Sequence, residues 1–485
     1  MKIVYARCAG LDVHKKSVNV CIRQGKGNKV ELVRGLFGTS TEELERMRAF
    51  LREHKVQRVV MESTGVYWIP VWNVLEQSTG KFSVVVVNPQ HVKALPGRKT
   101  DEQDCERLAE LGQYDMLRGS FIPPPEVRRW RDLTRRRTHL QEDRNRVINR
   151  IGRHLETANI KLSSVVSDIV GKTGWAILNA LAAGEIDPEF LARLAYGTLK
   201  AKRAELTSAL RGFVTPHFRW LLRELLDDLS RLDRKLTELD MLIREQMRGH
   251  EEEIRRLCTI PGVKETTAWT ILAELGTNMS QFPDAAHAAS WAGLCPGNCE
   301  SAGKRQSGRT RKGNRYLRRM LVQNAWAVSH KSDCFLTALF HRVATRRGLK
   351  RACMAVAHKI LIIAYHLLRD GTVYQELGGD HYDRRSPERT AKRLTRRLQN
   401  IGYTVVLTRP EQGAAPAKVS PAAKALGTAR WKAPYDGITP RVADDRPPAT
   451  PEECRKCAKW GIPCLHKSRQ LLKRQDPAAI VKPST

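Results

Sequence analysis

The chain has 485 residues and a formal net charge of +33, with 84 Lys and Arg residues against 51 Asp and Glu. This length predicts about two to four domains, and the charge predicts a polyanionic partner. Nucleic acid fits that partner better than a membrane, because no apolar run approaches the roughly 18 residues of a spanning helix. The N-terminus lacks the pattern of a signal peptide and the 11 cysteines are an odd number. We therefore expect a cytoplasmic protein whose cysteines are reduced thiols or metal ligands.

The first part of the chain alternates short apolar runs with segments of helical periodicity. This order is typical of an α/β domain, which we expect to end near the three prolines at 123–125. The predicted strands cover residues 3–22 as a hairpin, 31–37, 58–61 and 82–87, and the predicted helices cover residues 41–51, 66–75 and a segment that begins at Thr100.

Two long helices are predicted next. Residues 128–155 carry nine arginines between Arg128 and Arg150, and residues 218–247 have leucines at alternating spacings of four and three. That spacing is a heptad seam, so we expect an antiparallel coiled coil. The sequence leaves open whether it joins two copies of the chain or pairs only within one chain.

Residues 257–276, LCTIPGVKETTAWTILAELG, predict two helices joined by a Pro-Gly turn. The pattern resembles a helix-hairpin-helix, whose turn offers backbone amides to a DNA phosphate, although a plain αα-hairpin has similar spacing. Further helices over residues 314–328 and 334–368 indicate a second, mostly helical domain. The predicted domains are therefore residues 1–125, 126–250, 251–380 and 381–485.

Between these helices, residues 299–319 have the sequence CESAGKRQSGRTRKGNRYLRR, with eight Lys or Arg residues and no acid after Glu300. Its glycines allow close approach to a phosphate, beside which Ser301 or Ser307 could be a nucleophile. The alternative is a solvated basic loop whose serines support turns. The side chains expected to contact nucleic acid are Lys304, Arg305, Arg309, Arg311, Lys312 and Arg315.

Four acids in the α/β domain could share one site: Asp12, Glu62, Asp101 and Asp104. Neighbouring strands can place the first two side by side, and the last two lie on one face of a helix. Such carboxylates could hold two Mg²⁺ ions about 4 Å apart and leave positions for water and phosphate. Taken singly, each has an ordinary explanation as a helix-start acid, a cap or a turn residue.

Residues 385–450 are rich in Arg, Ala, Pro and Gly, which predicts a flexible linker with one short strand over residues 403–407. The sequence CRKCAKWGIPCLH follows. Its Cys454, Cys457, Cys464 and His466 could form a zinc knuckle, and the alternative is a tail without metal.

The chain resembles the DEDD-type transposases of bacterial insertion sequences in segments that occur together and in order: GLDVHKKS at 10–17, MESTGVYW at 61–68, VNPQHVKALPGRKTDEQDCERLAEL at 87–111, IPGV at 260–263 and ESAGKRQSGRTRKGNRYLRR at 300–319. The resemblance spans residues 1–380. It implies a RuvC-like, RNase H-fold N-terminal domain in which the four acids form the Mg²⁺ tetrad, and a helical domain in which Ser301, rather than Ser307, attacks DNA to form a phosphoserine link.

The same resemblance implies a noncoding bridge RNA that pairs with donor and target DNA, and a homo-oligomer, either a dimer or a tetramer. Residues beyond 385 extend past the family's core, and we expect an accessory nucleic-acid-binding tail there. Two other functions stay open: a metal-dependent nuclease or junction resolvase in which water attacks, and a non-catalytic RNA- or DNA-binding protein.

Overall fold

The computed structural model describes residues 3–26, 29–63, 65–77, 82–89, 101–117, 119–296, 299–301, 304–308, 310 and 312–408. The chain divides into two compact units. Of the described residues, those up to Val147 and Asp227–Val406 belong to one unit, and Ile148–Leu226 belong to the other.

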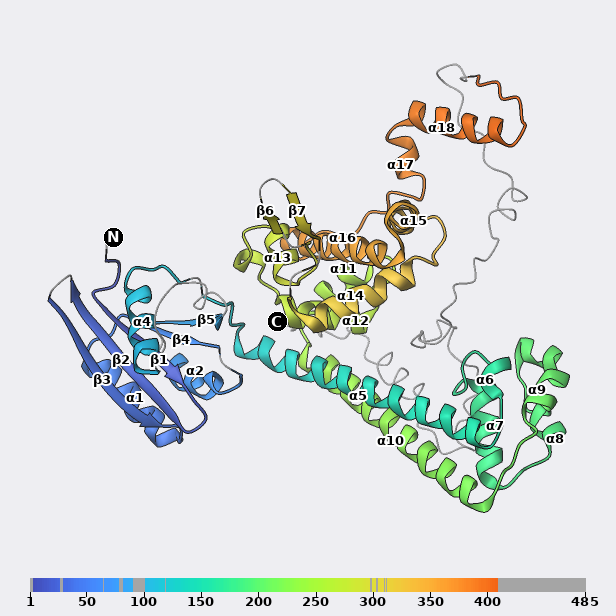
Figure 1. Ribbon diagram of the computed structural model, residues 1–485, viewed down its shortest axis with the longest axis horizontal. Coiled ribbons are helices and arrows are strands. Elements are labelled where there is room, and N and C mark those ends of the chain that lie inside the picture. Colours follow the sequence, from blue (N-terminus) through green and yellow to red (C-terminus); the bar gives the residue numbers. More distant parts are fainter. Residues whose placement is uncertain are drawn as a thin grey trace, which may run out of the picture. The chain divides into compact units, whose positions relative to one another are not determined.

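A five-stranded sheet forms the N-terminal part of the first unit (Figure 1). Its strand order is β3-β2-β1-β4-β5; the first three strands pair antiparallel, and β4 is parallel to both β1 and β5. This mixed order around a central first strand fits the expected RNase H-like domain. The strands are β1 (Arg7–Val13), β2 (Ser17–Lys26), β3 (Lys29–Gly38), β4 (Arg58–Glu62) and β5 (Ser83–Val87).

Helices cover both faces of this sheet. Leu11 and Met61 belong to the core that includes the buried side chains of α1 (Thr41–Glu53) and α2 (Trp68–Glu76). Cys8 and Val60, which alternate with them along the strands, pack instead with Leu108 of α4 (Asp101–Gln113). In β1 and β4, successive side chains therefore face the two helical layers in turn.

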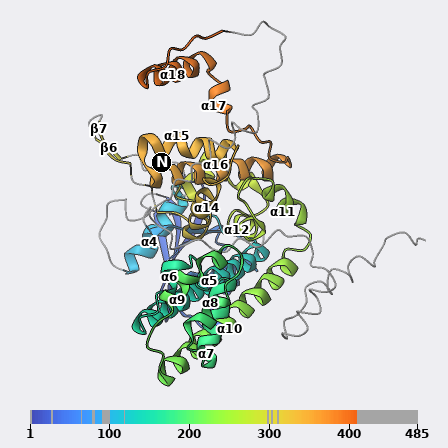
Figure 2. The same ribbon diagram turned by 90° about the vertical axis from the view of Figure 1, so that its right-hand side faces the viewer.

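The two predicted long helices are α5 (Pro125–Thr157) and α10 (Pro216–Gln246), which run side by side in both ribbon views (Figures 1 and 2). They are antiparallel, because Arg137 pairs with Asp240 at 2.6 Å and Arg144 pairs with Asp233 at 2.5 Å. Leucines 222, 229 and 236 and Ile243 are buried at intervals of seven. Pairing within one chain is thus present, while the coiled-coil assignment and a role in dimerisation stay predictions.

In chain order, several short helices follow α5 and precede α10, and the sequence analysis did not predict them one by one. Their ends carry strong local signals: Asp187 caps α8 just before Pro188, and Gly184 ends α7 at φ 116°. The elements are α6 (Leu162–Val165), α7 (Lys172–Ala183), α8 (Pro188–Arg193), the 3₁₀ helix η1 (Gly197–Lys202) and α9 (Arg203–Ala209).

The helical domain of the first unit is built around α16 (Leu349–Asp370), whose apolar side chains dominate one buried cluster. By length and composition α16 could span a membrane, but half of its most apolar window is buried, as expected of a core helix. The other elements are α11 (Glu251–Cys258), α12 (Glu265–Leu275), η2 (Met279–Gln281), α13 (Ala285–Trp291), α14 (Arg315–Val328) and α15 (Phe335–Arg347). The turn between α11 and α12 makes a helical hairpin, and its DNA-contacting role stays a prediction.

The linker predicted after residue 380 begins with two helices, α17 (His381–Arg384) and α18 (Pro387–Asn400). The linker prediction is wrong for the residues of these helices. The sequence did not reveal α18 because this helix has no buried residue and lacks the long apolar stripe from which helices are recognised. Residues 403–407 form no strand. The predicted zinc ligands Cys454, Cys457, Cys464 and His466 lie outside the described residues.

Candidate active site

Asp12 and Glu62 lie at the carboxyl ends of two neighbouring strands. β1 and β4 pair in parallel, and Leu11 and Met61 are their last paired positions, so each acid comes one residue later. Leu11 and Met61 face the α1/α2 core. Because side chains alternate along a strand, the two acids are directed to the face that α4 covers. Both are half-buried.

A glycine brings α4 onto this face at backbone distance. A Cβ atom on Gly10 of β1 would lie 1.9 Å from the carbonyl oxygen of Cys105 and 2.6 Å from the amide nitrogen of Ala109. Gly112 of α4 also allows this close packing, since a Cβ there would lie 2.6 Å from the Cys8 sulfur. The two glycines thus fix α4 against β1 beside the strand that ends in Asp12.

Asp101 and Asp104 stand in the first turn of α4. Asp104 is half-buried, whereas the side chain of Asp101 lies outside the described part of the structure. The hydrogen bond with Cys21, burial and the nearby charge of Asp12 raise the pKa of the Cys105 thiol. Gly10, two residues before Asp12, meets the backbone of Cys105, the residue after Asp104, so the end of β1 lies beside the first turn of α4.

Among the side chains that the structure describes, no group of three or more His, Cys, Asp or Glu residues is close enough to hold a metal ion. The donor chemistry nevertheless fits a hard divalent cation. Asp12, Glu62 and Asp104 offer only carboxylate oxygens, which such cations prefer over sulfur or nitrogen.

His14 is a site residue that sequence reasoning missed. Its Nε2 atom lies 2.9 Å from Oδ2 of Asp12, and its side chain is 45% exposed. The signal available in the sequence was its position two residues after an expected metal ligand. A hydrogen bond of this kind can orient a carboxylate towards a metal ion.

The predicted serine loop is a β-hairpin. Ser301 ends β6 (Cys299–Ser301) and is paired with Lys304, which begins β7 (Lys304–Ser307). Ser307 is paired with Cys299, so Ser301 lies beside the turn and Ser307 lies at the open end. The side chains of residues 299–301 and 304–307 are outside the described part, as are Arg309 and Arg311 entirely. Lys312 and Arg315 are exposed.

A buried carboxylate that the sequence analysis did not single out lies in the helical domain. Glu274 of α12 has no exposed surface and accepts hydrogen bonds from Nε and Nη2 of Arg135 at 2.8 and 2.9 Å. Arg131 adds an ion pair at 3.4 Å and donates to the carbonyl oxygens of Ala273 and Glu274. Burial, partly opposed by Glu274, lowers the pKa of Arg131 to about 10. The feature of the sequence that could have identified Glu274 is its position as an acid inside the apolar sequence WTILAEL.

Asn314 connects this carboxylate to the segment that leaves the hairpin. Its side-chain amide donates to Glu274 at 2.6 Å, and its side-chain oxygen accepts from the backbone amides of Tyr316 and Leu317 at 3.1 Å. It is therefore the N-cap of α14. Gly313 packs so closely that a Cβ would lie 2.3 Å from the amide nitrogen of Gly293. The end of the hairpin segment is thus held firmly on the helical domain.

The two parts of the candidate site match two transposase families. Residues 9–160, which contain the four acids, match the DEDD family of IS110 type, described as Transposase. Residues 254–339, which contain Glu274 and the hairpin, match the Transposase IS116/IS110/IS902 family. The chain belongs to the IS110-type transposases.

Two bacterial relatives of this chain are also named as transposases. A probable family 20 transposase of Pseudomonas aeruginosa is 25% identical over 68% of this chain and 89% of its own length. The transposase for insertion sequence element IS1111A of Coxiella burnetii is 26% identical over 60% of this chain and 72% of its own length. Among solved structures, Thermus thermophilus RuvC is similar at 15% identity over 24% of this chain and 99% of that chain, with a TM-score of 0.19.

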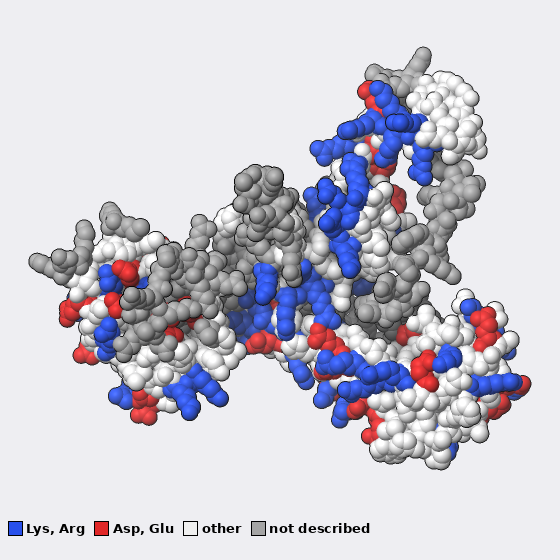
Figure 3. Space-filling model, in the orientation of Figure 1, with Lys and Arg blue, Asp and Glu red and all other residues white. Residues whose placement is uncertain are grey.

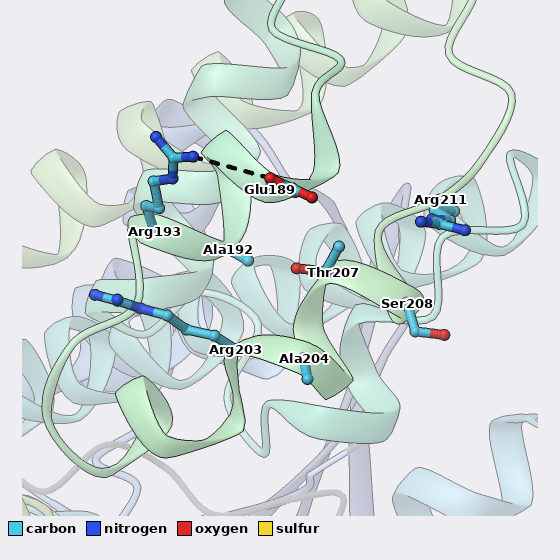
Figure 4. Close-up of a pocket in the computed structure, with 8 residues that line it drawn as sticks. All are labelled: Glu189, Ala192, Arg193, Arg203, Ala204, Thr207, Ser208 and Arg211. Atoms are coloured by element: carbon cyan, nitrogen blue, oxygen red, sulfur yellow. Dashed lines mark ion pairs between the residues drawn. The ribbon is translucent and has the colours of Figure 1, made fainter.

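A hollow of about 530 Å³ lies in the second unit of the transposase, between α8 and α9 (Figure 4). The carboxylate on its wall, Glu189, is paired with Arg193 at 3.9 Å. Because Glu189 is the single acid among the residues that line it, the hollow offers no set of acids for metal-dependent phosphoryl transfer. Its remaining lining residues are Ala192, Arg203, Ala204, Thr207, Ser208 and Arg211.

Proposed function

We propose that this transposase cuts and rejoins DNA with two Mg²⁺ ions held by Asp12, Glu62, Asp101 and Asp104 and with Ser301 as the nucleophile. The observation that carries the proposal is the parallel register of β1 and β4, which supports a shared site for Asp12 and Glu62 on the face covered by α4. Bound Mg²⁺ would supply Lewis acidity at the scissile phosphate.

The protein's own residues supply the nucleophile and stabilise the charge of the phosphoryl group. The Ser301 hydroxyl loses its proton and its oxygen bonds to phosphorus, while the bond from phosphorus to the leaving sugar oxygen breaks and that oxygen takes up a proton. The resulting phosphoserine ester retains the energy of the phosphodiester, so a second strand's hydroxyl can displace the serine without ATP. Lys304, paired directly across from Ser301, is suited to stabilise the charge on the phosphoryl oxygens, and Arg305 would assist.

We further infer that a noncoding bridge RNA guides the reaction and that the transposase acts as a homo-oligomer. The resemblance of the motifs and the charge of +33 support the RNA partner, since base pairing would select the sequence while the protein holds the backbone. Sequencing the RNA that copurifies from cells carrying the neighbouring noncoding DNA tests this. Recovery of only bulk cellular RNA would contradict it.

Ser301→Ala tests the nucleophile, with Ser307→Ala as the matched change at the other end of the hairpin. We expect Ser301→Ala to abolish recombination and the trapped protein–DNA adduct, and Ser307→Ala to retain both. Full recombination by Ser301→Ala, with no adduct in the parent protein, would instead favour a nuclease or resolvase in which water attacks.

Asp12→Asn tests the carboxylate site. It should remove strand exchange while nucleic-acid binding stays close to that of the parent. Unchanged strand exchange would refute the metal tetrad, and the absence of any strand exchange in the parent would favour a non-catalytic binding protein.

A further inference from the structure

A basic surface lies outside both regions that match the transposase families. From Phe335 to Arg369 the sequence contains no Asp or Glu, and this segment forms α15 and most of α16. Around the turn between these helices, five basic side chains are exposed: Arg342, Arg346, Arg347, Lys350 and Arg351. Figure 3 shows Lys and Arg gathered over this part of the molecule.

These side chains lack counter-charges within the described part of the chain, where none of the five forms an ion pair with a carboxylate. Lys350 and Arg351 also stand in the first turn of α16, which begins at Gly348 without a side-chain cap. The helix dipole disfavours cations there. The fold therefore carries repulsion at this turn that a bound polyanion would relieve.

A second group of basic side chains lies on α18. At about 100° per residue, Arg389, Lys392, Arg393, Arg396 and Arg397 fall within an arc of about 140° on one side of this helix. Arg393 pairs with Asp383 of α17 at 3.1 Å. The other four have no carboxylate partner among the described residues.

Contacts through α17 link the two groups. The ring of Tyr382 stacks on Phe335 of α15 at 5.6 Å, and the guanidinium of Arg342 lies 4.8 Å from the centre of the Tyr382 ring. Thr390 of α18 donates to Asp383 at 3.1 Å. The residues of α15, α17 and α18 therefore form one connected part of the first unit.

We propose that this basic ridge, formed by Arg342, Arg346, Arg347, Lys350 and Arg351 together with Arg389, Lys392, Arg396 and Arg397, binds the phosphate backbone of a nucleic-acid duplex. Arg and Lys without carboxylate partners are what a phosphate backbone selects, and they release its counterions on binding. A membrane-binding surface must insert apolar groups, and between residues 341 and 351 no large apolar side chain is exposed, so this turn fits a lipid surface less well than a phosphate backbone. On α18, Leu394 and Leu398 are 49% and 41% exposed, and binding to phosphatidylserine vesicles decides whether they insert into lipid.

The ridge extends the proposed function, because it would hold donor DNA, target DNA or a folded RNA away from the serine hairpin. Its test uses binding alone and so does not depend on the catalytic assignments. The full chain carries Arg346→Gln, Arg347→Gln, Lys350→Gln and Arg351→Gln in one variant, and Arg389→Gln, Lys392→Gln, Arg396→Gln and Arg397→Gln in another. Binding to a DNA duplex and an RNA duplex of about 30 base pairs is measured by fluorescence anisotropy over a series of salt concentrations.

The matched control removes the same charge from four exposed arginines that each pair with an acid three residues earlier in the chain. These are Arg46, Arg231, Arg248 and Arg255, paired with Glu43, Asp228, Glu245 and Glu252. We expect each ridge variant to lower the slope of log affinity against log salt by up to about 3–4, and the control to lower it by less than about 1.

Loss on the DNA duplex alone assigns the ridge to substrate DNA, and loss on the RNA duplex alone assigns it to RNA. Equal slopes for the ridge variants and the control would overturn the proposal. So would an unchanged slope combined with lost binding to phosphatidylserine vesicles, which would point to a lipid surface. Failure of Ser301→Ala to block recombination would leave this result untouched, so the two failures are distinguishable.

Discussion

The side-chain amide of Asn314 donates to the buried carboxylate of Glu274 at 2.6 Å, while its oxygen caps α14. Asn314→Ser separates these two roles, because serine keeps a capping oxygen but loses the amide donor. We expect Asn314→Ser to lower the free energy of unfolding by about 1–3 kcal/mol, since it leaves a buried acceptor less satisfied. Urea denaturation of the full chain measures this.

Glu274→Gln supplies the control for Asn314→Ser. If the contact is the cause, the double variant should lose less than the sum of the single variants, with a coupling of about 1 kcal/mol. Additive losses would mean that Asn314 acts only as a helix cap.

Arg135 holds Glu274 through two hydrogen bonds, and Glu274 has no exposed surface while the Arg135 side chain is 35% exposed. Arg135→Met leaves the buried carboxylate with weaker pairing, so we expect it to lower the free energy of unfolding by about 3–5 kcal/mol. Arg231→Met is the control, because Arg231 pairs with Asp228 at an exposed position and should cost less than about 1 kcal/mol. Similar losses for the two variants would contradict the structural role of Glu274.

Gly10→Ala should disturb the contact between β1 and α4. Its new methyl group meets the carbonyl oxygen of Cys105 at 1.9 Å, so we expect a loss of about 1–3 kcal/mol in unfolding free energy and weaker strand cleavage. Gly152→Ala, inside helix α5, meets nothing closer than 3.9 Å and should stabilise the protein by up to about 1 kcal/mol. A Gly10→Ala protein as stable as the parent would show that α4 can move off the strand.

His14→Ala should weaken the metal site without removing a ligand. Loss of the hydrogen bond to Asp12 is expected to raise the Mg²⁺ concentration needed for half-maximal cleavage by about 10–100-fold, with less effect on the rate at saturating Mg²⁺. His287→Ala breaks a similar histidine–aspartate contact, to Asp284 at 2.9 Å, at an exposed helix start. It should leave the Mg²⁺ dependence unchanged, and an equal shift in both variants would contradict a role for His14 at the metal site.

The sequence predicted the α/β domain because its strands are short apolar runs, and local patterning of this kind needs no knowledge of distant contacts. The same reasoning placed Asp12 in the first strand region and Glu62 at the end of a later strand. Local patterning could not identify Glu274, because its structural role depends on Arg135, 139 residues away in the chain, and on Asn314, the N-cap of another helix. The serine segment was expected as a loop, since the pairing of Ser301 with Lys304 involves strands of only three and four residues.

The ion pairs between α5 and α10 restrict how the length of these two helices can change. Arg137 and Arg144 are seven residues apart, and so are their partners Asp240 and Asp233. One residue inserted between the two arginines would turn the rest of α5 by about 100° and direct Arg144 away from its partner. Seven residues added to both helices would restore the match. A change in helix length between these two pairs therefore keeps both pairs when it adds about 10 Å to α5 and α10 together.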